Sequence, residues 1–505
     1  MAINLNLGID FGTKFTKVCV RDTDRERSWV ITFTNGSPNL DEALLPTKIG
    51  ICSDGSLLAG LTESEWKTQP QTQIDVDFIK MRLANIELTK EGEGYSFDSL
   101  PKFHEIDLNT PENLENISAY YLSRVILKAK AWVLKNNADL VKGQKISWSI
   151  NIGVPVKYFD SNAINRFCKV LSLAYLLSES HPESLTFNHL NDYATLLKND
   201  ASNRENISCF AIPEIAAAVY SYTISRQAEP GIYIFFDVGS GTIEGASFRF
   251  FRENKMPKIE FYTGEVEPIG MNALAKQVNM RVADIPEFKI EKQLVDNSYL
   301  MLQNIESLSK QVGPQSPNEH YHVANSVDVG FNGKVTIELI KKALENQPSI
   351  EEQMILNLIL LGQRRIHRQV AEVVVTCKEK SPEYFKSSSS LRVFLGGGGG
   401  ISEFYRHTIE STHAAFDHKY AGIPVYDLRD VPFPGQGGTE ADKFDMSGIE
   451  HSHFHRFSIA YGLSIPDYEA PEVTGFPRQF PIVPSPPHQP ITPESGRYPD
   501  DNSSM

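Results

Sequence analysis

Two segments of this 505-residue sequence share one pattern, and this internal repeat is the strongest constraint on the fold. Each segment is an apolar run that ends in a carboxylate, passes a glycine-containing bend and continues as a second β-rich run: GIDFGTKFTK and GIYIFFDVGSGTIEGASFRF. The aligned positions, about 227 residues apart, are Asp10 with Asp237, Gly12 with Gly239, and Thr13 with Ser240. Repeats at this separation predict two similar lobes that face each other, with the bends between them.

Strands alternate with long helices around these repeats. NLENISAYYLSRVILKAKAWVLKNN has apolar residues at helical spacing, the apolar run ISWSINIGVPV follows it, and SNAINRFCKVLSLAYLLSES has helical spacing again. The chain is 41% apolar and 22% charged, which is ordinary for a globular protein and sufficient for two or more domains. The pattern therefore predicts an α/β fold with largely covered sheets.

Composition excludes several classes of partner. The net charge of -14 argues against nucleic acid, whose backbone is bound mainly through clustered Lys and Arg. No run of about eighteen apolar residues predicts a membrane span, and the N-terminus lacks the pattern of a secretory signal. The five cysteines are scattered without a CxxC pair, so no zinc or redox role is predicted. We expect a cytoplasmic protein that binds neither nucleic acid nor membrane.

The repeated bend has a chemistry of its own. Glycines let successive backbone N–H groups converge on an anion, and a neighbouring hydroxyl adds a donor. A carboxylate would repel phosphate directly but suits Mg²⁺ or its water shell. One glycine-rich hairpin is usually only a structural turn. Two with matched carboxylates predict a clamp on one polyphosphate.

A third glycine tract strengthens this hypothesis. LRVFLGGGGGISEFYRHTIES, from Leu391, is an apolar strand followed by five glycines and a helix pattern. A flexible linker is the alternative, but linkers rarely join a buried strand directly to an amphipathic helix. The glycines would let a flat ligand lie against the backbone.

Taken in order, the three tracts resemble the first phosphate, second phosphate and adenosine motifs of the superfamily of actin and the seventy-kilodalton heat-shock ATPases. PEIAAAVYSY resembles its first connecting helix, FSIAYGLS its second, and INIGVPVKYFDSNAINRF its VPAYF region. The resemblance covers roughly residues 8 to 464. It implies a bilobed actin-like ATPase fold, with two ribonuclease-H-like lobes around an interlobe cleft for ATP and Mg²⁺. The implied ranges are 1–212 for the first lobe, 213–464 for the second lobe and 465–505 for a Pro-rich disordered tail.

The resemblance also implies roles for individual residues. The implied metal-water carboxylates are Asp10 and Asp237, and the implied nucleotide-binding residues are Gly12, Thr13, Lys14, Lys17, Gly239, Ser240, Gly241, Thr242, Gly396, Gly397 and Gly398. The implied catalytic residues are Lys17 on a β- or γ-phosphate, Glu214 orienting the attacking water, and Asp237. Lys17 could instead be a solvated strand lysine, and Glu214 a carboxylate favoured at a helix start.

Departures from the family pattern limit the comparison. Lys14 replaces a second threonine of the chaperones, and Gly400 replaces the arginine that covers adenine, so stacking must come from elsewhere or be absent. Lys67, Lys80 and Arg82 lie where chaperones keep a catalytic lysine and basic neighbours, but no alignment assigns one of them.

The functional prediction is an ATP-binding, chaperone-like ATPase switch. About forty residues follow Ser464, with many prolines, which predicts a tail rather than a peptide-binding domain. The tail could dock an unknown protein partner or serve only as a solubilising extension. A self-assembling bacterial actin homologue and a small-molecule kinase stay as alternatives, as does ATP binding without hydrolysis. The histidines of HSHFH could bind a metal, but the pattern favours the lead-in to the second connecting helix.

Overall fold

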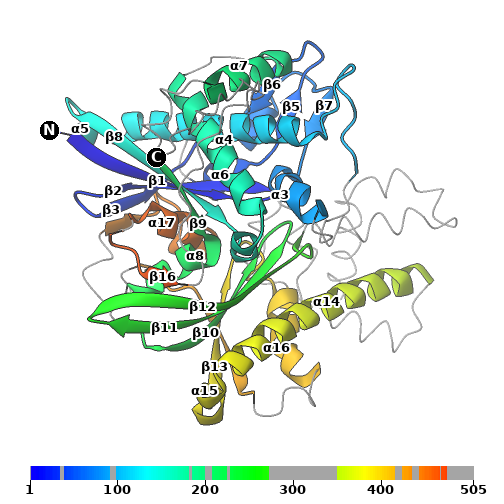
Figure 1. Cartoon of the computed structure of the whole chain (residues 1–505), viewed down its shortest axis with the longest axis vertical. Coiled ribbons are helices and arrows are strands. Elements are labelled where there is room, and N and C mark those ends of the chain that lie inside the picture. The colour runs from blue at the N-terminus through cyan, green and yellow to red at the C-terminus, as the bar shows by residue number, and fades with distance from the viewer. Residues whose placement is uncertain are drawn as a thin grey trace, which may run out of the picture.

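The computed structural model describes residues 2–33, 39–90, 98–180, 185–199, 208–224, 228–271, 350–415, 423–434, 443–466 and 468–474. Three sheets are present among these residues, two of them large, together with long helices. The predicted α/β class is therefore confirmed. In Figure 1, layers of helices and sheets alternate down the molecule.

The first large sheet has the order β15–β3–β2–β1–β8–β9, and β4 also pairs with β2. Its strands are β1 (Ala2–Phe11), β2 (Phe15–Asp22), β3 (Arg27–Val30), β4 (Leu45–Pro46), β8 (Lys145–Val154), β9 (Cys209–Pro213) and β15 (Phe444–Asp445). β1, β2 and β3 pair antiparallel, whereas β8 lies parallel to β1, and β9 parallel to β8. The first copy of the sequence repeat is the β1–β2 hairpin.

The second large sheet repeats this arrangement. Its strands are β10 (Gly231–Val238), β11 (Ile243–Glu253), β12 (Met256–Glu267), β13 (Ser390–Gly396), β14 (Val425–Asp430) and β16 (Glu472–Thr474). The order is β14–β13–β10–β11–β12–β16, in which β10, β11 and β12 pair antiparallel, and β13 and β14 run parallel to β10. The second repeat, β10–β11, thus has the same position in its sheet as β1–β2.

Side chains of β10 alternate between two hydrophobic cores. Tyr233 and Phe235 belong to a core that lies between the two sheets, whereas Ile234 and Phe236 belong to a core on the outer face. Alternation places successive side chains on opposite faces of a strand, so a strand that is apolar on both faces must be covered twice. The outer cover is α14 (Ile350–Lys380) with α16 (Glu403–Ala415), and α15 (Pro382–Ser387) follows α14.

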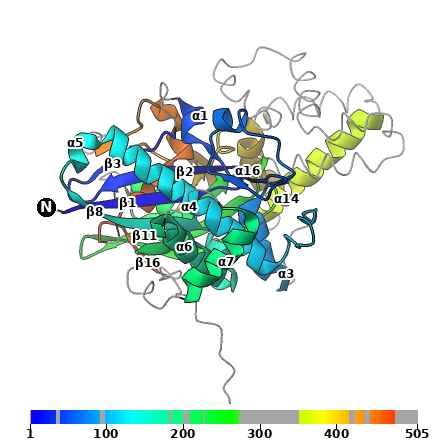
Figure 2. The ribbon, with the colours of Figure 1, turned by 90° about the horizontal axis from the view of Figure 1, so that it is seen from above.

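Helices also cover the outer face of the first sheet. The main ones are α4 (Pro111–Asn136), α6 (Ala163–Ser180) and α7 (Phe187–Asn199). Figure 2 shows α4 and α6 over the first sheet, with α14 extending away from the body of the molecule. The remaining elements here are α1 (Leu40–Ala43), β5 (Ile49–Ile51), β6 (Leu57–Ala59), α2 (Glu63–Trp66), β7 (Ile74–Val76), α3 (Ile79–Lys90), α5 (Ala138–Val141) and the 3₁₀ helix η1 (Val156–Asp160). β6, β5 and β7 form the small third sheet.

Two short helices, α8 (Glu214–Thr223) and α17 (Ser458–Ser464), lie between the sheets and pack against each other (Figure 1). Their backbones come very close at one point. A Cβ atom on Gly462 would lie 1.8 Å from the carbonyl oxygen of Ala217. Glycine is therefore required there by the close approach of the two helices.

The end of α17 is bound to the first sheet by buried amides. The side chain of Asn6 on β1 donates a hydrogen bond to the carbonyl of Ser464 (2.9 Å), and that of Asn151 on β8 donates to the carbonyl of Leu463 (2.7 Å). The last carbonyl groups of a helix have no hydrogen-bond partner within the helix, and burying them without a partner would be costly. The two amides supply the missing hydrogen bonds. They also fix α17 relative to two strands of the first sheet.

Two short strands depart from the predicted ranges. β15 lies in the range assigned to a second lobe, yet it pairs with β3 of the first sheet. β16 lies in residues 465–505, for which we expected a disordered tail, and that expectation is wrong for 472–474 because their backbone pairs in parallel with β12. The ion pair of Glu469 with Arg21 also holds this segment. The prediction for 475–505 lies outside the described residues.

Within the described part of the chain, no helix is long and apolar enough to cross a membrane.

Candidate functional site

The two repeated hairpins place two carboxylates at equivalent positions. Asp10 is opposite Lys17 in the β1–β2 ladder, and Asp237 is opposite Glu244 in the β10–β11 ladder. Lys17 Nζ lies 2.5 Å from Asp10 Oδ2. The two hairpins thus share their backbone arrangement and an aspartate at the same position. The residue paired with that aspartate is a cation, Lys17, in the first hairpin and an anion, Glu244, in the second.

Glycines shape both bends. The N–H of Gly12 donates to the carbonyl of Asp10 (3.0 Å), and a Cβ atom on Gly12 would lie 2.3 Å from the Phe15 carbonyl oxygen. In the second bend the N–H of Gly239 donates to the carbonyl of Thr242 (2.9 Å). Larger residues would not fit the first bend without a shift of the backbone.

The two bends touch each other. A Cβ atom on Gly241 would lie 2.6 Å from Thr13 Cγ2 and 2.3 Å from Met81 Sδ, so the tip of the second bend packs directly on the first. Segments more than two hundred residues apart therefore meet at one place. Thr13 on one side of this contact, and Ser240 and Thr242 beside Gly241 on the other, line a pocket.

The pocket lies where the two bends and the glycine tract converge, and it has about 690 Å³ of space, including space open to solvent. The predicted site residues that line it are Asp10, Gly12, Thr13, Lys14, Lys17, Glu214, Asp237, Gly239, Ser240, Thr242, Gly397 and Gly398. Gly241 and Gly396 do not line it: Gly241 packs on Thr13, and Gly396 ends β13 opposite Asp237.

The glycine tract after β13 turns tightly against β10. Gly397 has φ of +75°, and its Cβ atom would lie 2.7 Å from Asp237 Oδ1. The N–H of Gly399 donates to the carbonyl of Val238 (2.9 Å). The left-handed conformation and the lack of space both require glycine at 397. The turn therefore presents bare backbone to the pocket.

Glu214 forms a buried ion pair with a residue that the sequence did not assign. The Lys80 ammonium on α3 donates to the Glu214 carboxylate at the start of α8, and both side chains are buried. Burial raises the pKa of Glu214, against the opposing effect of Lys80. Burial alone would lower the pKa of Lys80, but Glu214 and Asp10 together outweigh it and raise that pKa, so the ammonium stays charged.

Two further buried carboxyl groups belong to the second hairpin. Burial, with the nearby Asp10 and Glu214 carboxylates, raises the pKa of Asp237 to about 7. Burial, with Glu214, raises the pKa of Glu244 well above its usual range, although Glu244 accepts a hydrogen bond from the Val156 N–H. A concentration of buried carboxyl groups with shifted pKa values is typical of functional sites.

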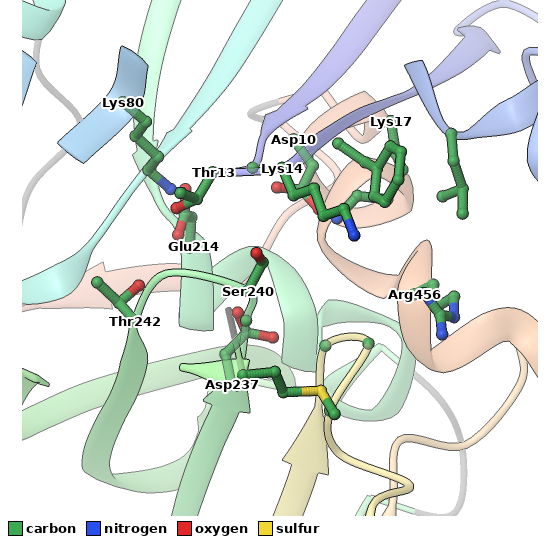
Figure 3. A pocket seen from close by; sticks show the side chains of 18 residues that line it. Asp10, Thr13, Lys14, Lys17, Lys80, Glu214, Asp237, Ser240, Thr242 and Arg456 are labelled. Atoms are coloured by element: carbon green, nitrogen blue, oxygen red, sulfur yellow. The ribbon is translucent and has the colours of Figure 1, made fainter. Parts of the chain in front are cut away.

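Several residues complete the pocket that the sequence did not predict. They are Phe15, Leu44, Lys80, Met271, Gly399 and Arg456. Figure 3 shows Lys80 and Glu214 on one side and Arg456 on the opposite side, with Asp237 and Ser240 below. Lys80 had one indication in the sequence, because a lysine within the apolar start of a helix is unusual. The sequence could not show which residue Lys80 contacts.

The histidine pattern HSHFH forms the lead-in to α17 that we expected. It occupies the 3₁₀ helix η6 (His451–Arg456), in which His453 and His455 are buried and His451 stacks on Phe433 at 4.1 Å between ring centroids. Among the described residues, no group of three or more His, Cys, Asp or Glu side chains could hold a metal ion.

Comparison of the sequence with known protein families and with curated proteins finds no match.

Proposed function

We propose that this protein binds ATP with Mg²⁺ in the pocket and hydrolyses it, as a chaperone-like conformational switch that acts through a protein partner. The observation that carries the proposal is the pair of equivalent hairpins whose carboxylates and glycine bends meet at one pocket. Two such bends can surround one polyphosphate, and the glycine turn after β13 offers a flat surface beside them.

The finer fold proposed is bilobed and actin-like, with two ribonuclease-H-like lobes. Its support is the shared strand order: in each sheet three antiparallel strands are followed by two parallel ones. The resemblance of the three glycine tracts to the actin and heat-shock ATPase superfamily agrees with this order. Helices α8 and α17 would be the connections across which the lobes reorient.

In this proposal the phosphates lie between the bends. The backbone N–H groups of 13–14 and 240–242 would donate to phosphate oxygens, and the Lys17 and Lys14 ammonium groups would offset their charge. Lys17 contacts Asp10 in the present structure, so its ammonium lies at the pocket wall already. Phosphoryl transfer needs mainly positioned charge, which this set of donors supplies.

The acidic residues fit a hydrated Mg²⁺ ion. Asp237 Oδ1 is buried and has no hydrogen-bond partner among the described residues, and Asp10 lies at the equivalent position of the other hairpin. One or two carboxylates with water and phosphate oxygens are the usual Mg²⁺ ligands in proteins. Asp10 and Asp237 would hold the ion, which would neutralise phosphate charge.

Glu214 would orient the water that attacks the γ-phosphate. A carboxylate accepts a proton from water only if it is ionised, and the charged Lys80 ammonium favours that form. Lys80 would therefore position Glu214 and oppose the effect of burial on its ionisation. The short helix α8 would transmit loss of the γ-phosphate to the packing between the sheets.

The test is release of inorganic phosphate from Mg-ATP by the purified chain, with calorimetry for binding. We expect Asp10→Ala and Glu214→Ala to abolish release, with Glu214→Ala retaining ATP binding. Arg368→Ala, on an exposed side chain of α14, is the control for both. Absence of ATP binding by the wild-type chain would refute the proposal.

A second cavity favours a small-molecule kinase as the second candidate. It has about 580 Å³ of space, including space open to solvent, and shares Thr13, Lys14, Phe15 and Ser240 with the first pocket. Lys48 and Asp77 also line it, so a polar acceptor could lie beside the phosphate bends. Transfer of phosphate from ATP to members of a sugar panel, in place of release to water, would favour this candidate over an ATPase switch.

A further inference from the structure

A buried arginine lies at the end of the pocket away from the proposed hydrolysis residues. Arg456 is 6% exposed and lines the pocket together with Gly397, Gly398 and Gly399. Figure 3 shows its guanidinium across the pocket from Lys80 and Glu214. Arginine side chains are seldom this buried, and the guanidinium of this one borders the pocket.

The fold fixes the backbone of Arg456 against the glycine turn. The N–H of Gly397 donates to the carbonyl of His455 (3.2 Å), which joins η6 to the turn one residue before the arginine. Phe454 of η6 packs against Phe444 and Tyr461, with ring centroids 5.6 and 5.9 Å apart respectively. The arginine thus projects from a rigid support, which suits a residue that must meet a ligand at a defined place.

The guanidinium lies over the turn itself. A Cβ atom on Gly398 would be 3.0 Å from Nη1, 3.4 Å from Cζ and 3.7 Å from Nη2 of Arg456, so three atoms of the planar group are near one point of the backbone. On the next residue, Met271 Sδ would be 2.8 Å from a Cβ atom of Gly399. A planar cation and a soft apolar side chain therefore flank adjacent glycines.

We propose that Arg456 is a specificity-determining residue that stacks its guanidinium on the base of a purine nucleotide. The inference rests on the proposed function, because it takes the nucleotide to lie with its phosphates at the hairpin bends. With the phosphates there, the nucleoside extends toward the glycine turn, where Arg456 and Met271 lie. Gly400 provides no side chain for this purpose, so η6 supplies the stacking group that the glycine tract lacks.

Arginine suits this contact better than lysine does. Its delocalised, weakly hydrated plane stacks on aromatic faces, whereas an ammonium is a compact and strongly hydrated charge. A contact to the α-phosphate is the competing role for the same cation. The two roles differ in a measurable way, because adenosine has the base without any phosphate and tripolyphosphate has phosphates without a base.

The experiment compares ligand binding to the full chain and its variants by calorimetry. The variants are Arg456→Lys, Arg456→Gln and the exposed control Arg368→Gln, each first shown to keep the circular dichroism spectrum of the wild type. The ligands are Mg-ATP, Mg-GTP, Mg-CTP, adenosine and magnesium tripolyphosphate.

We expect both Arg456 substitutions to lower the affinity for adenosine, Mg-ATP and Mg-GTP about tenfold, the change expected for loss of a desolvated cation–π contact. The affinity for Mg-CTP, which has a smaller ring, should fall less, and the affinity for tripolyphosphate should fall less than threefold. Equal weakening of ATP and tripolyphosphate, or unchanged adenosine binding, would assign Arg456 to phosphate or to structure and overturn the inference. Wild-type protein that binds no nucleotide would refute the proposed function as well.

Discussion

Replacement of Gly462 by alanine tests the packing of the two helices that lie between the sheets. The new Cβ would be 1.8 Å from the Ala217 carbonyl oxygen, a contact that real structures do not tolerate below about 3.0 Å. The helices α8 and α17 would have to separate by roughly 1 Å or more. Overpacking costs about 1–3 kcal/mol, and rigid backbone on both sides places this case near the upper value.

A smaller gain opposes this loss. Alanine is favoured over glycine within a helix by about 1 kcal/mol. The net decrease in the free energy of unfolding should therefore be about 2 kcal/mol. Because α8 begins at Glu214 and α17 follows Arg456, the same displacement would move residues on opposite sides of the pocket and weaken Mg-ATP binding.

Urea unfolding followed by circular dichroism measures the effect. Gly231→Ala is the matched control, because the nearest atom to its new Cβ is 3.8 Å away. The free energy of unfolding of the control should lie within about 0.5 kcal/mol of the wild-type value. An unfolding midpoint for Gly462→Ala equal to that of the control would refute the reasoning from helix contact.

Further predictions concern the pocket. Lys80→Met should cost about 3 kcal/mol of stability by leaving Glu214 buried and unpaired, and the double variant with Glu214→Gln should recover most of it in urea unfolding. Gly397→Ala, at φ of +75° and 2.7 Å from Asp237 Oδ1, should weaken Mg-ATP at least tenfold in calorimetry, and unchanged affinity would contradict the proposed contact with the turn. Glu244 has a raised pKa in the folded state, so its contribution to wild-type stability should fall as pH rises above about 4.5, by at most about 1.4 kcal/mol per pH unit. Asp237 and Glu214 also have raised pKa values, so Glu244→Gln should decline less steeply than the wild type, and urea midpoints with equal pH dependence in the two proteins from pH 5 to 8 would contradict the prediction. Removal of Mg²⁺ with EDTA should abolish phosphate release from ATP, and activity that persists would exclude the proposed role of the ion.

The sequence predicted the parts of the fold whose signals are local. Both hairpins have an apolar run, a carboxylate and glycines within about ten residues, and each begins and ends close to where the pattern places it. The long helices α4 and α6 follow from apolar spacing. The internal repeat also allowed one prediction about distant segments. Because the two hairpins have the same sequence pattern, they could be predicted to have equivalent positions in two sheets without any knowledge of the contacts between them.

Contacts between remote segments were not predictable. Lys80 meets Glu214 across 134 positions of sequence, and neither residue has a neighbour whose pattern indicates the other. Arg456 follows a histidine-rich stretch whose pattern favoured the lead-in to a connecting helix over a metal site, and that pattern indicated no ligand contact. A single sequence reports which side chains a segment presents, but the packing of sheets and helices decides which of them converge.

Short edge strands escaped prediction for a different reason. β15 and β16 have two and three residues, too few for an alternating pattern to be recognised. Their pairing with β3 and β12 depends on backbone hydrogen bonds, which almost any side chain permits. The prolines near β16 also favoured a disordered interpretation, although none of its three residues is proline.

The two hairpins share a backbone but differ in the residue that faces each carboxylate. Lys17 faces Asp10, so under the proposed function the first hairpin can both hold the ion and offset phosphate charge. Glu244 faces Asp237 and instead accepts a hydrogen bond from the N–H of Val156, which belongs to η1 after β8 of the first sheet. The second hairpin therefore links the two halves of the molecule. Because this link begins opposite the proposed metal carboxylate, a change in charge at the pocket would act directly on a contact that joins the two sheets.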